Sequence, residues 1–321
     1  MTLLRAADGF PDVFGIAARD LADPAAFLEK DYWVTQVIRA LNETAPGGFV
    51  LKGGTSLSKG YGIINRFSED VDILLVRQAG ESTARAERRL TDLTDAVAGS
   101  LGLSWEPARL PGRGRHASRG DLIRYPGSPI SGLDLVITSG TVLLETRIAE
   151  GDTPSEMCEI MTLIGEWAGL GAGEFEDLAP FRIRVLEPRR TLIEKLVAVH
   201  HAMSTWTPDR PPNQQRFGRH YYDVYKLLAH PDTLDKLADR VRFGHLLAEI
   251  EMISDEFYGG HTERPDEGFA HSIAFTPPHD TELRRWAGES YRISMGLLSP
   301  AEAKPDFTQV LRRVAEKNDL L

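Results

Sequence analysis

The spacing of apolar residues along the chain changes repeatedly, and each spacing predicts a different element. Between residues 25 and 43, apolar side chains recur every three or four positions, which predicts an amphipathic helix beginning after Asp23-Pro24. We expect the charged run at residues 29–31 to form a solvated edge of this helix. Further helical runs are found at residues 55–64, 83–99, 156–171, 189–204, 220–230, 232–258, 283–298 and 307–321.

Short apolar or alternating runs predict strands between these helices. They are found at residues 49–51, 71–75, 103–105, 122–125, 133–137, 141–148 and 181–186. Most of them fall in the first half of the chain, whereas the second half is mainly helical. The pattern therefore predicts an α/β core with a mixed sheet over residues 1–150, followed by a mainly helical domain over residues 151–321.

Residues 49–75 contain a strand, a glycine turn, a helix and a second strand in one short segment. Gly53 and Gly54 follow the first strand, and glycine allows a positive φ and a close approach of the backbone to a ligand. Thr55 or Ser56 is suited to cap the helix, whose free N–H groups would bind an anion such as a triphosphate. The side chains that could add contacts to the phosphates are Ser56, Ser58 and Lys59.

Asp70 and Asp72 lie at the head of the next strand. Alternate residues of a strand face the same side, roughly 7 Å apart along it, so the two carboxylates share one face. Such a pair is costly unless a cation lies between them, and Mg²⁺ takes carboxylate oxygens together with water and substrate phosphate. Two acids that hold metal opposite a turn that holds phosphate suit phosphoryl or nucleotidyl transfer. The alternative is a solvated acidic strand end after an ordinary turn.

The segments KGGTSLSKGY at 52–61 and NRFSEDVDI at 65–73 resemble the first motif of the AbiEii/AbiGii-type nucleotidyltransferase toxins, the family of the MenT-like type IV toxins. The resemblance covers most of the chain and implies a polymerase-β-like core. Four further segments are similar to family segments: EKDYW at 29–33, VLLETRIAEGDTPSE at 142–156, RTLIEKLVAVHH at 190–201 and RFGRHYYDVYKLL at 216–228.

The resemblance also implies roles for two residues of the second domain. Lys195 would neutralise the triphosphate, and Asp223 would orient this lysine or complete the charge network around the metal. Both would lean over a cleft between the domains. Without the resemblance, the two residues read as an ordinary pair on a helix surface.

A third carboxylate comes from a later strand in the wider nucleotidyltransferase superfamily. Asp134 and Glu145 are the candidates here, although Glu145 could equally pair with Arg147 or Arg124. One further cation is near the first motif in sequence. Arg66 could assist nucleotide binding or serve as a structural partner of Glu69.

Composition limits the class of protein. The net charge of −10 argues against indiscriminate nucleic-acid binding, which needs a basic surface. No apolar run approaches the roughly 18 residues of a membrane span, and the N-terminal residues lack a signal-peptide pattern. The single cysteine, Cys158, excludes a disulfide within the chain. We expect a cytoplasmic enzyme. The segment 109–124 is basic and opposes the acidic balance, with Arg109, Arg113, Arg115, His116, Arg119 and Arg124, and a long loop is predicted at residues 107–120.

The resemblance implies a toxin of a toxin–antitoxin or antiphage system. Its reaction would be Mg²⁺-dependent transfer of a nucleoside monophosphate from an NTP to RNA, with the 3′ end of tRNA as the expected acceptor, so that translation is blocked. A separate antitoxin protein would be its partner, and no membrane is involved. Two alternatives remain open: transfer to a protein hydroxyl or a small molecule of the aminoglycoside kind, and a non-catalytic nucleotide-binding partner in a defence complex.

Ser68 lies two residues before Asp70, which suggests a regulatory phosphosite. Phosphorylation would add about −2 of charge beside two carboxylates and would switch the enzyme off. A Ser68→Glu variant is therefore expected to lose transferase activity and toxicity. Full activity of this variant in a labelled-NTP assay would contradict the hypothesis.

Overall fold

The computed structural model describes residues 2–78, 80–108, 118–127, 140–149, 153–169, 174–257, 260–299 and 302–321. The chain divides into two compact units by its contacts. The first unit is Met1–Leu186 with Ser299–Ala301, and the second is Glu187–Leu298 with Glu302–Leu321.

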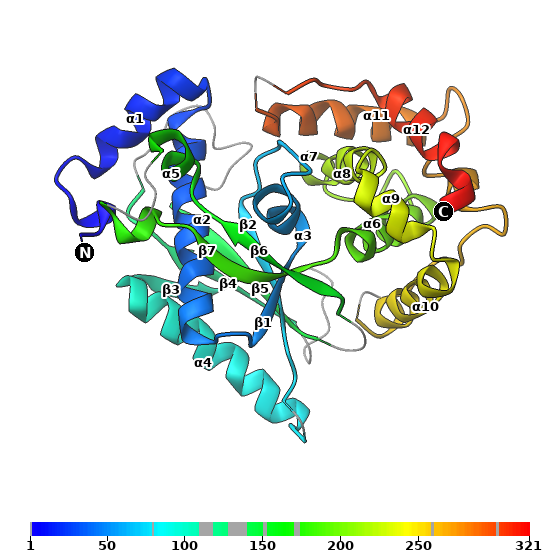
Figure 1. The fold of residues 1–321 in the computed structure, drawn as a ribbon. Helices are drawn as coiled ribbons and strands as arrows, with labels where there is room; N and C mark the ends of the chain where they lie inside the picture. Colours follow the sequence, from blue (N-terminus) through cyan, green and yellow to red (C-terminus); the bar gives the residue numbers. More distant parts are fainter. Residues whose placement is uncertain are drawn as a thin grey trace. The chain divides into compact units, whose positions relative to one another are not determined.

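In the part of the chain that the structure describes, the first unit is built on a mixed seven-stranded sheet in the order β3-β4-β5-β2-β1-β7-β6 (Figure 1). The pairs β1–β7 and β2–β5 are parallel and the other pairs are antiparallel, which confirms the predicted α/β class and mixed sheet. The strand predicted at residues 133–137, with Asp134, lies outside the described residues. The strands are β1 (Phe49–Lys52), β2 (Asp70–Leu75), β3 (Ser104–Pro107), β4 (Ser118–Arg124), β5 (Thr141–Ile148), β6 (Ser155–Ile160) and β7 (Phe181–Leu186).

The helices of the first unit precede or connect these strands. They are η1 (Leu4–Ala6), α1 (Phe10–Leu21), α2 (Ala25–Thr44), α3 (Gly53–Thr55), the π-helical turn η2 (Ser56–Gly60), α4 (Thr83–Leu101), α5 (Leu163–Ala168) and η3 (Glu176–Leu178). The prediction that α4 ends at Gly99 was wrong by two residues. The helix continues to Leu101, and Gly102 ends it at a φ of 68°, a conformation that glycine adopts without strain.

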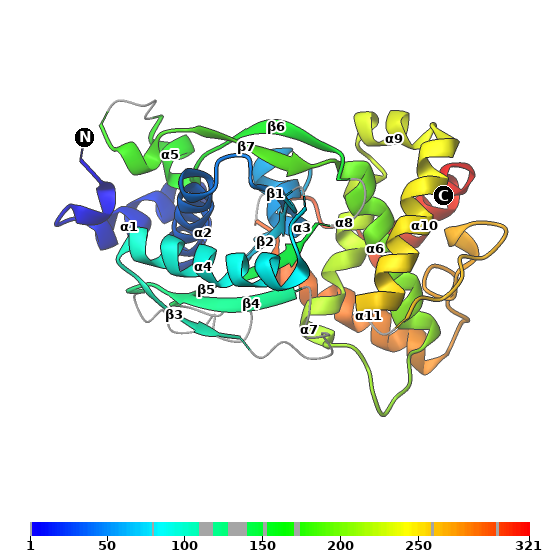
Figure 2. The ribbon, with the colours of Figure 1, turned by 90° about the horizontal axis from the view of Figure 1, so that it is seen from below.

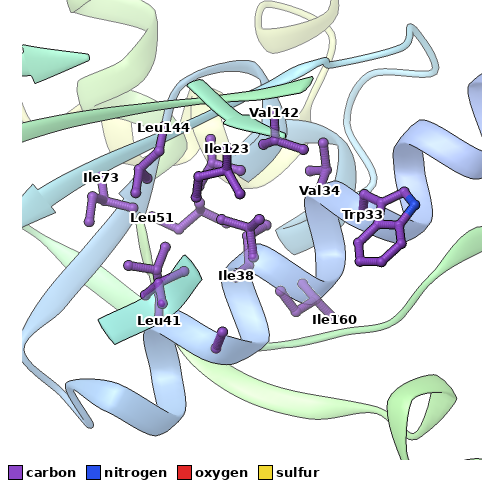
Figure 3. Close-up of a cluster of buried hydrophobic side chains, with 14 of the residues drawn as sticks. Trp33, Val34, Ile38, Leu41, Leu51, Ile73, Ile123, Val142, Leu144 and Ile160 are labelled. Carbon is purple, nitrogen blue, oxygen red and sulfur yellow. The ribbon is translucent and has the colours of Figure 1, made fainter. Parts of the chain in front are cut away.

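Helix α2 is the centre of the first unit. Figure 2 shows α2 nearly end-on, with β6 and β7 on one side of it and β4 and β5 on the other, so the sheet curves around the helix. Figure 3 shows Val34, Ile38 and Leu41 of α2 beside apolar side chains of the strands. These strand residues include Leu51, Ile73, Ile123, Val142 and Leu144.

The charged run of α2 is buried, and the prediction of a solvated edge was wrong. Glu29, Lys30 and Asp31 are each less than a tenth exposed because the helix is covered on several sides. Buried charges require partners. The Lys30 ammonium donates to the carbonyl of Thr141 at the start of β5, and Asp31 forms an ion pair with Lys59.

Residues 155–160 form a strand, although helical spacing was expected from 156 to 171. Strand β6 pairs along its whole length with β7, from Ser155 opposite Leu186 to Ile160 opposite Phe181. Among the described residues of this range, the helical part is Leu163–Ala168, capped by the Thr162 hydroxyl, which accepts from the amide of Gly165. Because β6 and β7 extend the sheet, the first unit continues to Leu186, and the expected boundary at residue 150 is too early.

The second unit is mainly helical. The described part of the region predicted as helical at residues 232–258 forms two helices, α9 (Pro231–Leu237) and α10 (Arg240–Phe257). No helix in the described part of the chain is long and apolar enough to cross a membrane. The elements are α6 (Pro188–Ser204), α7 (Gln214–Phe217), α8 (Arg219–Leu227), α9 (Pro231–Leu237), α10 (Arg240–Phe257), η4 (Phe269–His271), α11 (Glu282–Ser294), η5 (Met295–Leu297), α12 (Phe307–Glu316) and η6 (Asn318–Leu320).

The central position of α2 predicts that its apolar residues dominate the stability of the first unit. Ile38 is 0% exposed, so Ile38→Ala should lower the free energy of unfolding by about 2–5 kcal/mol. The matched control is Ile16→Ala on α1, where the side chain is 51% exposed and a change within about 0.5 kcal/mol is expected. Urea unfolding followed by circular dichroism measures both, and equal losses would contradict the assignment of α2 to the core.

Candidate active site

The candidate site lies on the sheet face opposite α2. On β2, Val71, Ile73 and Leu75 belong to the core around α2, so the alternate residues Asp70 and Asp72 point to the other face. The alternating residues of β2 thus have different roles on the two faces of the sheet. The apolar set fixes β2 in the sheet, and the acidic set is held on a rigid surface.

Strand register places residues from three strands in one row across this face. Asp72 of β2 lies opposite Lys52 of β1 and opposite Glu145 of β5. The next residue in the row is Gly120 of β4, which has no side chain. Directly paired residues bring their Cβ atoms to about 4.5–5.5 Å, so Asp72 is flanked by a cation on one side and a second carboxylate on the other.

The electrostatics of Asp72 follow from this row. Burial, and next the Glu145 carboxylate, raise the pKa of Asp72 to about 8, and the charge of Lys52 opposes the shift. Asp72 and Glu145 also share a hydrogen bond. Glu145, one of the two candidates for a third acid, therefore lies beside Asp72, and the other candidate, Asp134, lies outside the described residues. Arg124, a predicted partner of Glu145, binds Glu106 at 2.6 Å.

The carboxylates of this row are the kind of ligand that a divalent cation such as Mg²⁺ takes in proteins. Among the residues that the structure describes, no three His, Cys, Asp or Glu side chains are grouped as a metal site. Mg²⁺, however, commonly takes only one or two protein carboxylates and completes its shell with water and substrate phosphate. The repulsion that contributes to the raised pKa of Asp72 is what such a cation would relieve. The residues therefore fit a cation that is bound together with a phosphate substrate.

The glycine turn lies directly against the acids. Gly53 has a φ of 73°, and a Cβ atom there would lie 2.3 Å from Oδ2 of Asp72. A Cβ atom on Gly54 would lie 2.5 Å from Nη2 of Arg66 and 2.9 Å from Oγ of Ser68. At position 53 the positive φ and the contact with Asp72 together favour glycine, whereas a side chain at position 54 would displace the Arg66 guanidinium.

The helix after the turn is shorter than predicted, and its hydroxyl groups bind within the protein. It ends at Gly60 and not at Ile64, as one α-helical turn followed by the π-helical turn η2. The Thr55 hydroxyl donates to the carbonyl of Asp70, and the Ser56 hydroxyl donates to the carbonyl of Gly53 at 2.8 Å. The prediction that Thr55 or Ser56 caps the helix was wrong, because the N-cap residue is Lys52 and no side chain caps this helix. Phosphate binding by Thr55 and Ser56 stays a prediction.

Lys59 is held by the protein. Its ammonium lies 2.6 Å from Oδ1 of Asp31 and donates to the carbonyl of Met161 at 3.0 Å. The other oxygen of Asp31 accepts from the amide of Leu163 at 2.8 Å. Asp31 therefore connects α2, η2 and the start of α5, and the predicted contact of Lys59 with a triphosphate would require this ion pair to open.

Arg66 and Ser68 lie beside the turn, as their position between the two halves of the motif suggests. Arg66 is 4% exposed and donates to the carbonyl of Phe67 at 3.1 Å. The hydroxyl of Ser68 is half-buried and lies 2.9 Å from that of Thr55. A phosphate on Ser68 would therefore enter the turn itself, close to Gly54.

Lys195 and Asp223 form a buried ion pair in the second unit. The Lys195 ammonium on α6 lies 2.7 Å from Oδ2 of Asp223 on α8. Lys195 is 8% exposed and Asp223 is 0% exposed, so the surface-pair reading was wrong. An ion pair at this depth requires good geometry to offset its desolvation, which suits a pair kept for positioning or function. Its role in nucleotide binding stays a prediction.

Two arginines of the basic segment are described, and both lie on strand β4 and bind within the protein. Arg119 donates to the Asp121 carboxylate at 2.6 Å and to the Thr91 hydroxyl at 2.8 Å. Arg124 pairs with Glu106 of β3. The remaining basic residues of this segment, Arg109, Arg113, Arg115 and His116, lie outside the described residues.

Sequence reasoning missed two charged residues near the site, Lys52 and Asp31. Lys52 became significant only through strand register, which places it opposite Asp72. Asp31 lies 28 positions before its partner Lys59 and was assigned to solvent. Both lie within segments quoted for the family resemblance, so the segments were found but not the contacts of these residues.

Comparison with known proteins supports the motif. The family model described as nucleotidyl transferase AbiEii toxin, type IV TA system, matches residues 36–244. A solved structure of MenT4, a nucleotidyltransferase toxin from Mycobacterium tuberculosis H37Rv, superposes with a TM-score of 0.51 at 15% sequence identity, over 96% of this chain and 97% of that chain. The likeness to MenT4 shows a shared fold. A search of curated proteins gives no match.

The raised pKa of Asp72 predicts a pH dependence of stability when no divalent cation is bound. The unfolded chain releases this proton near the ordinary value of 3.8, whereas the folded chain retains it to about 8. Between these values the folded state binds more protons, so the contribution to stability is complete below about pH 4 and is lost as the pH rises through 8.

Urea unfolding of the wild type and of Asp72→Asn in chelator, at pH 5 and pH 8, measures this contribution. The wild type should lose more unfolding free energy than the variant between the two values, because the asparagine does not ionise. Parallel losses in the two proteins would contradict the assignment of the shifted pKa to Asp72.

Proposed function

Because the chain belongs to the AbiEii family of nucleotidyltransferase toxins from type IV toxin–antitoxin systems, we propose that it transfers a nucleoside monophosphate from an NTP to RNA. The observation that carries the proposal is the contact between the glycine turn and the acid row. Gly53 packs on the Asp72 carboxylate, and Glu145 lies beside Asp72 on the next strand. The groups proposed to bind phosphate and the groups proposed to bind the cation are thus neighbours on one face of the sheet.

Each group has a distinct task in this reaction. The N–H groups that follow Lys52 at the start of the short helix bind the triphosphate, and Gly53 and Gly54 allow the phosphates to approach the backbone. Asp70 and Asp72 hold Mg²⁺, with Glu145 as the further carboxylate of the row. When bound there, Mg²⁺ supplies charge stabilisation at the α-phosphate and at the departing pyrophosphate.

Cation binding at these carboxylates is coupled to the protonation of Asp72. The proton that Asp72 retains up to a pKa of about 8 must leave before both carboxylates can act as ligands, so cation binding and proton release are coupled. Lys195 and Asp223 are proposed to contribute a positioned cation to triphosphate binding. Their burial and their 2.7 Å separation support a fixed lysine more than a mobile surface one.

The proposed acceptor is RNA, with the 3′ end of tRNA as the specific target and blocked translation as the consequence. The net charge of −10 means that RNA would be bound locally and not over the whole surface. A cognate antitoxin protein is the proposed partner, and growth arrest is the proposed outcome when it is absent. The proposed place of action is the cytoplasm, and antiphage defence is the proposed setting.

The test is a transfer assay with purified protein, Mg²⁺, each α-³²P-labelled NTP in turn and total bacterial RNA. We expect label in a tRNA-sized band with the wild type and a loss of at least about 100-fold with Asp72→Ala, because a carboxylate of the metal pair is removed. The matched control is Asp92→Ala, which removes an exposed aspartate from α4 and should leave the label unchanged.

The other outcomes separate the alternatives. Label on a protein or a small molecule, absent from RNA, would keep the chemistry and reject the acceptor. NTP binding without label on any acceptor would favour a nucleotide-binding partner in a defence complex. Equal labelling by the wild type and Asp72→Ala would reject the acid row as the catalytic site.

A further inference from the structure

Lys52 occupies a special position at the candidate site. It is the last residue of β1 and the residue immediately before the glycine turn, with extended backbone angles. Its register partner on β2 is Asp72, and paired residues of adjacent strands project from the same face. Because Leu51 belongs to the core around α2, Lys52 points to the opposite face, which carries the acids.

The side chain is partly accessible, unlike several charged residues around it. Lys52 is half-buried, whereas Arg66 is 4% exposed and packs against Gly54. The positive charge of Lys52 also acts on the carboxylate of Asp72, since it opposes the rise in the pKa of that group. The ammonium therefore acts on the acids, and part of the Lys52 residue is exposed to solvent.

The other lysine beside the turn has a different environment. Lys59 lies at the far end of the short helix, where Asp31 and the carbonyl of Met161 hold its ammonium. This arrangement anchors η2 to α2 and α5. The two lysines that flank the turn are thus separated, one on the acidic face of the sheet and one tied to the helical layer.

We propose that Lys52 is a substrate-binding residue whose ammonium contacts the β- or γ-phosphate of the NTP, while the Asp31–Lys59 pair fixes the turn. The proposal rests on the proposed function and names a residue for it. Lys52 pairs in register with Asp72 and immediately precedes the glycine turn. It therefore lies between the carboxylates proposed to hold the cation and the N–H groups proposed to bind the phosphates. A lysine, with a compact charge on a flexible stem, suits this contact.

The charge of the complex supports the same assignment. Asp70, Asp72 and Glu145 bring up to three negative charges to one face, and a triphosphate adds more. One divalent cation leaves a negative excess. A lysine in the row reduces this excess without taking a coordination position on the metal, and it would stabilise charge that builds up on the leaving pyrophosphate.

The test compares nucleotide binding in Lys52→Gln, Lys52→Arg and Lys304→Gln. Calorimetry with Mg²⁺ and a non-transferable α,β-methylene NTP analogue gives Kd, and the labelled assay gives kcat and KM. Lys52→Gln should weaken analogue binding by about 10- to 100-fold, the loss expected for a hydrogen bond to a charged group. Lys52→Arg should recover part of the loss. Lys304→Gln, which removes an exposed lysine charge, should match the wild type.

A second readout separates phosphate contact from a structural effect. The affinity for the corresponding NMP should be the same in Lys52→Gln and the wild type, because an NMP has no β- or γ-phosphate. Thermal unfolding checks that each variant is folded, and Lys52→Met, which keeps an unbranched stem, replaces Lys52→Gln if the latter is not.

The outcomes distinguish this proposal from the proposed function. Wild-type binding of the triphosphate analogue by the charge-removing variant, or an equal loss for NMP and triphosphate, would overturn the role of Lys52 and leave the proposed function intact. A wild-type protein that neither binds NTP nor transfers label would reject the proposed function itself.

Discussion

The placement of carboxylates side by side on a rigid sheet is the constraint on which the site depends. Strands β2 and β5 bring Asp72 and Glu145 into register, where burial and repulsion by the Glu145 carboxylate oppose ionisation of Asp72 and raise its pKa to about 8. The core on the other face, where Val71 and Ile73 pack around α2, holds β2 in place despite this repulsion. A positive group beside Asp72 is therefore favoured. Lys52 supplies a positive charge there, and the glycine turn that follows it in the chain supplies backbone N–H groups.

The buried charges of α2 bind two elements next to the candidate site, strand β5 and the turn η2. Lys30 binds the carbonyl at the start of β5, and Asp31 binds Lys59 at the end of the π-helical turn. Single-turn π-helical segments often occur at functional sites, where they change the direction of a helix. Here the turn brings Gly60 so close to Val185 of β7 that a Cβ atom would lie 2.9 Å from Cγ1. Helix α2 therefore fills the core of the first unit and also holds η2 in place through the Asp31–Lys59 ion pair.

The family and the geometry contribute different parts of the functional argument. Membership of the AbiEii family gives the class of reaction and the toxin–antitoxin context. The structure contributes the arrangement of individual groups: Glu145 as the acid next to Asp72, Lys59 as an anchor, and Lys195–Asp223 as a buried pair. The similarity to MenT4 at 15% identity is a similarity of fold, so the acceptor and the nucleotide must come from experiments on this chain.

The sequence by itself determined the features that depend on neighbouring residues. Strands β5 and β7, the glycine turn and the Asp70–Asp72 pair were identified because period, turn residues and short spacing are local properties. Tertiary structure decided what depends on distant segments. Pairing with β7 made a strand of residues 155–160, the curved sheet buried the charges of α2, and register selected Glu145 and Lys52 as neighbours of Asp72. Register is set by packing across the whole sheet, so no local pattern contains it.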